Sequence, residues 1–154
     1  MLRFAGPEDA SAVATVLIES RRTFLPFAPS AHPEHGVRQW VRDVLVPGGR
    51  VVVWKEYGDV VGVLATSEDE YFAWIDQLYL LPGFVGQGIG SKMLAHAHAV
   101  LHKPIRLYTF QQNEGARRFY ERHGYKTIEF TDGQGNEEKC PDVLYELQAP
   151  LADA

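Results

Sequence analysis

Three alternating glycines give the sequence its most informative stretch for chemistry. Gly86, Gly88 and Gly90 lie between an apolar segment that ends near Leu81 and a helix expected to begin at Ile89. Glycines at such a turn let neighbouring backbone N–H groups converge on one ligand and keep Cβ atoms out of its way. The positive end of the helix dipole adds to the attraction for an anion. The stretch therefore predicts a phosphate or pyrophosphate site built from main-chain groups.

Two other phosphate motifs do not fit this spacing. A nucleotide P-loop requires Gly-Lys followed by Ser or Thr, whereas Gly90 is followed by Ser91 and then Lys92. A dinucleotide fingerprint requires a glycine where Ser91 stands, and it belongs to an opening strand-helix-strand unit. A nucleotide-dependent oxidoreductase or methyltransferase therefore has the least support. A tight connection that binds nothing stays the simplest alternative.

A second motif accompanies the glycines, at the helix expected around residues 116–123. It consists of Asn113, Ala116, the pair Phe119-Tyr120 and the pair Gly124-Tyr125. Together the two motifs resemble those of the GNAT superfamily of N-acetyltransferases, with Gly88 and Gly90 in the two small positions of the coenzyme-binding motif. That motif usually opens with Arg or Gln, and this chain has Val85 there. Weaker coenzyme binding is expected, partly compensated by Gln87.

The resemblance implies acetyl-coenzyme A as the acyl-donor co-substrate and an acetyl transfer to a primary amine of a small molecule or peptide. The amine would attack directly, in a ternary complex. The alternative is a catalytically weak module that binds or senses acyl-coenzyme A. The coenzyme-binding residues expected by resemblance are Leu78, Tyr79, Leu80, Val85, Gly86, Gln87, Gly88, Gly90, Ser91, Asn113, Ala116 and Phe119.

Tyr120 and Asp76 are the expected catalytic residues. By resemblance, Tyr120 is the general acid beside the coenzyme sulfur; the alternative is a core aromatic on a helix face. Asp76 is the leading general base, since it is expected to share a face with Leu78 and Leu80 on a strand, and apolar neighbours would raise the pKa of its carboxyl. A structural hydrogen-bonding role is equally consistent with Asp76. Glu70 and a water chain stay as alternative bases.

The acceptor pocket is expected to include the aromatic residues Phe24, Phe27, Trp40 and Tyr71, with few basic residues nearby. This composition favours a small or aromatic-bearing cationic amine over an acidic acceptor. A homodimer is common among similar proteins and is possible here.

Charge and cysteine content narrow the remaining classes. The formal net charge of -5 argues against nucleic acid as a partner. The single cysteine, Cys140, cannot form an internal disulfide, which suits a reducing, cytoplasmic compartment. No apolar run approaches the roughly 20 residues of a membrane span, and no leader is expected. His98 and His102 are one helical turn apart but, with His96, lack a further ligand, so no metal is expected.

The elements that must position these residues follow from periodicity. Apolar steps of three and four predict helices over 7–22, 37–45, 89–101 and 116–123, and β-branched or aromatic runs predict strands over 50–57, 60–67, 71–81, 105–110, 125–130 and 143–147. The hairpin turn is expected at Gly58-Asp59. The fold class is α/β: a single GNAT-like domain over residues 1–154, with a mixed, mostly antiparallel central sheet flanked by helices on both faces.

Overall fold

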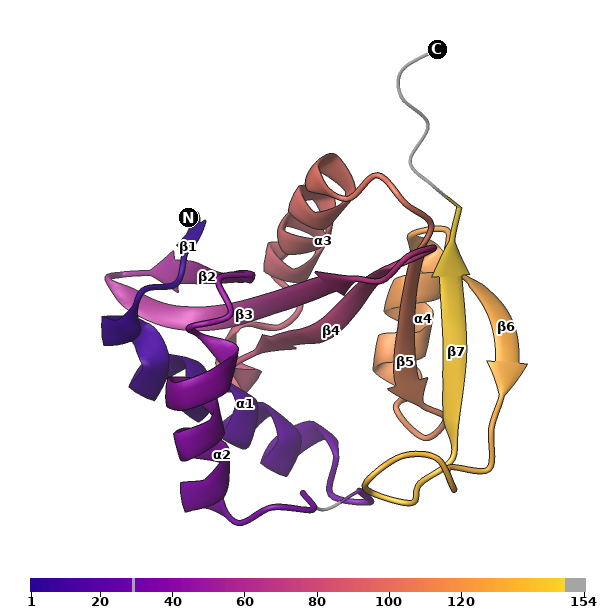
Figure 1. Cartoon of the computed structure of the whole chain (residues 1–154), viewed down its shortest axis with the longest axis horizontal. Coiled ribbons are helices and arrows are strands. Elements are labelled where there is room, and N and C mark those ends of the chain that lie inside the picture. Colours follow the sequence, from indigo (N-terminus) through magenta and orange to yellow (C-terminus); the bar gives the residue numbers. More distant parts are fainter. Residues whose placement is uncertain (29, 149–154) are drawn as a thin grey trace.

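A seven-stranded mixed sheet forms the centre of the structure (Figure 1), a computed structural model that describes residues 1–28 and 30–148. Residues 149–154 of the predicted domain lie outside this range. The strand order is β1-β2-β3-β4-β5-β7-β6. The strands are β1 (Leu2–Phe4), β2 (Val51–Glu56), β3 (Asp59–Glu68), β4 (Ala73–Leu80), β5 (Ile105–Phe110), β6 (Lys126–Phe130) and β7 (Asp142–Leu147). The predicted mixed, mostly antiparallel sheet is confirmed.

One junction in this sheet is parallel and short. β4 pairs with β5 only through Ala73 with Ile105 and Trp74 with Arg106, and all other neighbours are antiparallel. Beyond Trp74 the two strands diverge, so the sheet opens like a V (Figure 1). Backbone N–H and C=O groups in the second half of β4 are therefore left without partners on that side. Two cavities lie at this opening.

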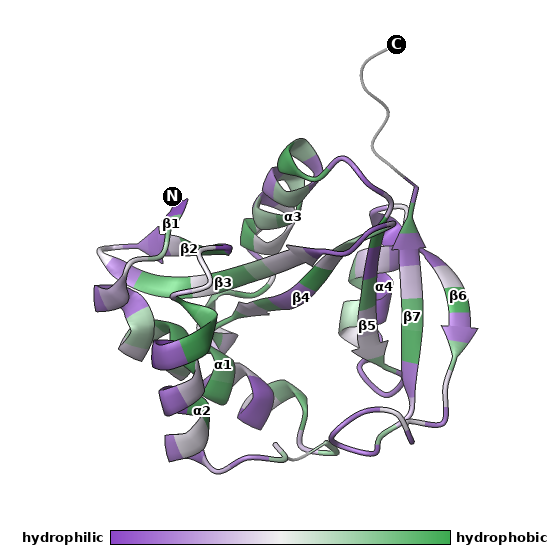
Figure 2. Ribbon diagram, viewed as in Figure 1, coloured by the Kyte–Doolittle hydropathy of each residue, from purple (hydrophilic) through white to green (hydrophobic). Residues whose placement is uncertain are grey.

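Helices cover both faces of the sheet, as predicted. A 3-10 turn (Pro7–Asp9) leads into α1 (Ala10–Phe24), which shares one face with α2 (Glu34–Trp40); α3 (Ile89–Val100) and α4 (Glu114–Arg122) share the other. Each face has its own apolar core, one around Val13 and Val63 and one around Leu94 and Leu107. Figure 2 shows the hydrophobic residues that run along β3 and β4 between these layers.

Three element predictions need correction. β1 was not expected from sequence; it is only three residues long and pairs with β2. The hairpin between β2 and β3 turns at Tyr57 and Gly58, both with positive φ (51° and 84°), and not at Gly58-Asp59. The strand predicted from residue 71 begins at Ala73, because the preceding turn is closed by the Asp69 carboxylate, which accepts from the backbone N–H groups of residues 71 and 72.

The second helix also departs from prediction. It begins at Glu34 and its last turn, Val41–Leu45, is a π-helix, so each turn there holds more residues than in an α-helix. The predicted apolar stripe is rotated by this change: Val41 is fully buried, whereas Trp40 is 40% exposed and Val44 is 57% exposed. Trp40 is therefore not part of the core.

Asp76 occupies a β-bulge in β4. Ala65 and Thr66 are consecutive on β3, yet their partners on β4 are Gln77 and Ile75, which leaves Asp76 as the extra residue. The bulge reverses the alternation of side chains, so Ile75 packs into the same cluster as Leu78 and Leu80. The expectation that Asp76 shares a face with those leucines is therefore wrong.

Among the described helices, none is long and apolar enough to cross a membrane.

Candidate active site

The glycine turn forms an open cradle at the start of α3. Gly86 (φ 79°) and Gly88 (φ 84°) adopt the left-handed conformation, and Gly88 is the residue from which α3 begins. A Cβ added at either glycine would meet no protein atom within 4 Å, so the space above the turn is free. The first N–H groups of a helix have no partner within it. The turn thus fits a pyrophosphate, whose charge would meet these N–H groups and the helix dipole.

A cavity of about 500 Å³ opens in front of this cradle, between the end of β4 and α4. It is lined by most of the expected coenzyme-binding residues: Leu78, Tyr79, Leu80, Val85, Gly86, Gly88, Gly90, Ser91, Asn113, Ala116 and Phe119. Gln87 is the exception, because its side-chain amide donates to the carbonyl of Gly83, 3.2 Å away. We call this the coenzyme cavity. The cavity is also lined by Ser20, Leu25, Gly115 and Arg122, which have no local signal in the sequence.

Two motif residues have clear structural reasons for their positions. Gly90 packs against α4, where an added Cβ would lie 3.4 Å from the Phe119 ring, so a small residue lets the two helices approach. Asn113 precedes α4, and its Oδ1 accepts from the backbone N–H of Ala116 at 3.2 Å. This is an N-cap, which stabilises a helix end typically by about 1 kcal/mol.

A second cavity of about 500 Å³ lies between β4 and β5. Arg21 of α1 and Leu25, just after α1, form one wall. Residues 75–79 of β4 and residues 107–110 of β5 form two others. The β6–β7 connection and the start of β7 contribute Thr131, Gly135, Asn136, Glu138 and Asp142. We call this the acceptor cavity. No local motif marks the β6–β7 residues as site residues, since the stretch 132–138 has the composition of an ordinary polar turn.

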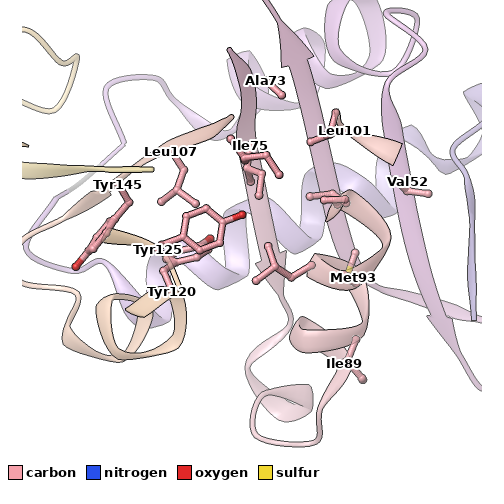
Figure 3. Close-up of a cluster of buried hydrophobic side chains, with 14 of the residues drawn as sticks. Val52, Ala73, Ile75, Ile89, Met93, Leu101, Leu107, Tyr120, Tyr125 and Tyr145 are labelled. Atoms are coloured by element: carbon pink, nitrogen blue, oxygen red, sulfur yellow. The ribbon is translucent and has the colours of Figure 1, made fainter. Parts of the chain in front are cut away.

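Tyr120 stands where the two cavities meet, because it lines both. It is 8% exposed, and its hydroxyl has no hydrogen-bond partner among the described residues. Its ring lies edge-on to that of Phe119. It also lies edge-on to that of Tyr125, its neighbour in Figure 3. Burial, with smaller contributions from Tyr79 and Tyr125, raises the pKa of the Tyr120 hydroxyl above its usual range. The phenol is therefore protonated at neutral pH and can act as a donor.

Asp76 faces the acceptor cavity. The side chain still reaches solvent, but the surrounding protein replaces part of its water, and this burial raises the pKa of the Asp76 carboxyl. A hydrogen bond with Ser67 and the charge of Arg50 oppose the shift. Among the described residues, Asp76 forms no salt bridge. A carboxylate of this kind can accept a proton from a ligand in the cavity.

The other expected acceptor residues are spread over the surface. Phe24 lines the coenzyme cavity, and Phe27 lies edge-on to Phe110 with ring centroids 6.0 Å apart. Trp40, Tyr71 and Glu70 line neither cavity. Tyr71 is 69% exposed in the turn before β4. The structure thus brings Phe24 and Phe27 close to the site and leaves the other three outside it.

The histidines of α3 do not form a metal site. No group of three or more His, Cys, Asp or Glu side chains gathers within residues 1–28 and 30–148. His98 is partly buried, and its ring is hydrogen-bonded to the Tyr125 hydroxyl at 3.0 Å. Cys140 lies outside both cavities, where its Sγ contacts the carbonyls of Phe27 and Glu138.

Known proteins with the same architecture bind coenzyme A. The PaiA N-acetyltransferase of Thermoplasma acidophilum, solved in complex with coenzyme A, has a TM-score of 0.77 and 22% identity over 96% of this chain and 98% of its own. YncA of Salmonella typhimurium, solved with acetyl-coenzyme A, has a TM-score of 0.74 and 18% identity over 100% of this chain and 95% of its own. These similarities show the fold.

Sequence comparison shows the family. The peptidyl-lysine N-acetyltransferase YiaC of Escherichia coli K12 is 24% identical over 129 residues, which is 84% of this chain and 85% of YiaC. Residues 15–125 match the acetyltransferase (GNAT) family, and they include the cradle, the divergent strands and Tyr120. The chain therefore belongs to the GNAT family and is an acetyltransferase that uses acetyl-coenzyme A.

Proposed function

We propose that this enzyme transfers the acetyl group of acetyl-coenzyme A to a primary amine by direct attack in a ternary complex. The observation that supports this is the meeting of two cavities of about 500 Å³ each at one buried phenol, Tyr120. Two substrates that enter from opposite sides of the sheet would come together there. Such proximity removes much of the entropic barrier of a two-substrate reaction.

The coenzyme cavity provides the donor site. The N–H groups at Gly88 and the first turn of α3 would bind the pyrophosphate, and the unpaired edge of β4 near Leu78 and Leu80 would pair with the amides of the pantetheine arm like an added strand. Val85 stands at the rim, 44% exposed, and contributes no charge. Main-chain donors are sufficient for phosphate binding, since they need no basic side chain.

Tyr120 would act on the sulfur. As the amine nitrogen forms its bond to the carbonyl carbon, the C–S bond breaks and negative charge develops on sulfur. Complete proton transfer from a phenol to a thiolate is uphill by at least about 2 kcal/mol, given usual pKa values of 10 and 8.5. The raised pKa of Tyr120 makes it a hydrogen-bond donor that stabilises the charge as it forms, and the released amine proton then completes the thiol.

Asp76 would receive the amine proton. An alkyl ammonium has a usual pKa near 10, so the acceptor must lose a proton before or during attack. Asp76 faces the same cavity without an ion-pair partner among the described residues, and one water molecule can relay the proton where the distance requires it. Cys140 lines neither cavity, which supports direct transfer over an acyl-cysteine route.

The test compares Tyr120→Phe with Tyr125→Phe. Each change removes the hydroxyl from one of two neighbouring rings. The Tyr125 hydroxyl is hydrogen-bonded to His98, and Tyr125 lines neither cavity. Release of free thiol from acetyl-coenzyme A is measured with a panel of amines, and coenzyme affinity by calorimetric titration. We expect Tyr120→Phe to lower kcat by about 100-fold with unchanged coenzyme affinity, and Tyr125→Phe to keep most activity.

Two results would contradict the proposal. Equal kcat for both variants would remove Tyr120 from the chemistry. Coenzyme binding without thiol release for any amine would instead favour a module that binds or senses acyl-coenzyme A.

A further inference from the structure

The acceptor cavity has an excess of negative charge. The charged side chains that line it are one arginine, Arg21, and three carboxylates: Asp76, Glu138 and Asp142. Arg21 and Glu138 form an ion pair with a 2.8 Å contact, which neutralises both. Asp76 and Asp142 form no salt bridge with any described residue. Two uncompensated carboxylates therefore face one cavity.

Asp142 is the more buried of the two, with 7% of its surface exposed. Its Oδ1 accepts from the Thr131 hydroxyl and its Oδ2 accepts from the Asn136 side-chain amide at 3.1 Å. These neutral donors orient the carboxylate but leave its charge in place. Buried charges in proteins normally have an opposite charge beside them. A cation supplied by a ligand would provide that partner.

An apolar strip separates the two carboxylates. Asp76 is on β4, Tyr108 and Phe110 are on β5, and Asp142 begins β7 directly opposite Phe110. Strands two places apart lie roughly 10 Å from each other, and β4 and β5 diverge further here. Tyr108 is 53% exposed and stacks on Trp74, with ring centroids 6.0 Å apart and planes at 10°. Phe27 adds an edge-on contact to Phe110.

A second observation indicates which end of the strip is reactive. The Tyr120 hydroxyl, on a side chain that is 8% exposed, has no hydrogen-bond partner among residues 1–28 and 30–148 and borders the cavity. Asp76 is two residues before Leu78, which, like Tyr120, lines both cavities. Asp142 lines only the acceptor cavity. The order from the reaction centre outward is thus Asp76, aromatic strip, Asp142.

We infer that the acceptor is an aliphatic diamine, whose distal ammonium is bound by Asp142 while its other amine is acetylated. This inference rests on the proposed function. The aromatic strip covers the methylene chain, and the distal ammonium pairs with Asp142. The near ammonium first loses one proton, through Asp76, to solvent. The neutral amine then forms the C–N bond as the C–S bond breaks, and its second proton ends on the coenzyme thiol. The distal ammonium stays protonated throughout, so the product has one positive charge less than the substrate.

Three substrates that share a five-carbon chain test the inference on the unmodified enzyme: cadaverine, n-pentylamine and δ-aminovalerate. They present a cation, a methyl group and a carboxylate at the distal end. We expect kcat/KM for cadaverine to exceed that for n-pentylamine at least about tenfold, with δ-aminovalerate the poorest. The difference should reside mainly in KM, since the distal group takes no part in bond making.

A variant pair assigns the effect to a residue. Asp142→Asn should remove the preference for cadaverine, whereas Asp132→Asn should keep it, because Asp132 is exposed and lines neither cavity. The comparison among substrates holds even if Asp142→Asn alters the loop, since the first experiment uses the unmodified chain.

The outcomes are distinct. Equal kcat/KM for cadaverine and n-pentylamine, or acetylation of a lysine-containing peptide in preference to both, would overturn the inference and leave acetyl transfer to amines standing. Coenzyme binding without acetylation of any amine would overturn the proposed function and the inference together.

Discussion

Arg21 Nη2 lies 2.8 Å from Glu138 Oε2, in an ion pair whose partners are 117 residues apart in the chain. The pair joins α1 to the β6–β7 connection across the mouth of the acceptor cavity. Only 21% of the Arg21 side chain and 16% of the Glu138 side chain are exposed. Arg21 also donates, at 3.5 Å each, to the Tyr79 hydroxyl and the Ala28 carbonyl. One guanidinium thus connects four segments around the cavity.

Loss of this ion pair should loosen the β6–β7 connection, and Cys140 can report it. The thiol is the only one in the chain and lies in that connection, with its Sγ 3.5 Å from the Phe27 carbonyl oxygen. We expect Arg21→Gln to raise the rate of Cys140 modification by a thiol reagent at least about threefold, since local opening exposes the sulfur. Labelling kinetics, followed by mass spectrometry, measure this.

The neighbouring arginine is the matched control. Arg22 bonds to exposed Glu19 on the solvent side of α1, so Arg22→Gln should leave the labelling rate unchanged. The double variant Arg21→Glu, Glu138→Arg should restore slow labelling. Equal rates for the Arg21 and Arg22 variants would mean that the ion pair does not hold the connection.

Asp76 should determine how the rate depends on pH. Burial raises the pKa of its carboxyl above the usual value of about 3.9, and only the ionised form accepts a proton. kcat at saturating amine should therefore fall as the pH drops through that raised pKa, which places the acidic limb above about pH 3.9. Asp76→Asn should remove this limb and lower kcat about 100-fold. A pH–rate profile of both proteins measures it.

The same substitution should stabilise the fold at neutral pH. A carboxyl whose pKa is raised in the folded state opposes folding once it ionises, so its cost appears as pH rises above the unfolded value. Asp76→Asn removes that cost, and urea unfolding at about pH 7 should show a higher midpoint. An inactive and destabilised variant would point to a structural role for Asp76 and against its assignment as the base.

Local signals in the sequence predicted most of the residues that line the coenzyme cavity. Gly86 and Gly88 adopt a positive φ that glycine permits at low cost, and Asn113 caps the helix that follows it, so neither feature depends on distant contacts. Most residue assignments around the coenzyme cavity agree with its lining for this reason. Gln87 differs because its amide finds a nearby carbonyl at Gly83.

The acceptor side depended on contacts that sequence patterns do not specify. The bulge at Asp76 arises from the register between β4 and β3, and register is a property of two strands. Val44 lies within the π-turn, whose larger number of residues per turn takes it off the predicted apolar stripe. Arg21 and Glu138 meet only because the folded chain brings α1 to the β6–β7 connection. None of these has a local signature, so they could not be predicted from the residues alone.

Gly88 offers a test of the cradle with a control in the same turn. Gly88→Ala places a side chain at φ 84°, a strained conformation that costs about 1–2 kcal/mol. It also puts a methyl group into the space in front of α3. Gly83→Ala meets no atom within 4 Å and needs no left-handed conformation. Calorimetric titration should show at least about tenfold weaker coenzyme binding for the first variant only. Equal affinities would place the pyrophosphate elsewhere.

His98 should make stability fall in mildly acidic solution. It lies on α3, half-buried, with Nε2 3.0 Å from the Tyr125 hydroxyl, and burial followed by the charge of His123 lowers the pKa of its imidazole. The unfolded chain therefore binds the proton more readily than the folded protein. The contribution of His98 to the free energy of unfolding is fully present above the usual pKa of about 6.5 and declines as the pH falls below it. Urea midpoints at about pH 7.5 and pH 5.5 measure the loss.

The chain has six histidines, so variants must assign this loss of stability to His98. His98→Gln retains a hydrogen-bonding group and should lose less stability between the two pH values than the unmodified protein. His102→Gln, at an exposed position just beyond the helix, should lose as much. The same loss in all three proteins would mean that other groups bind the proton.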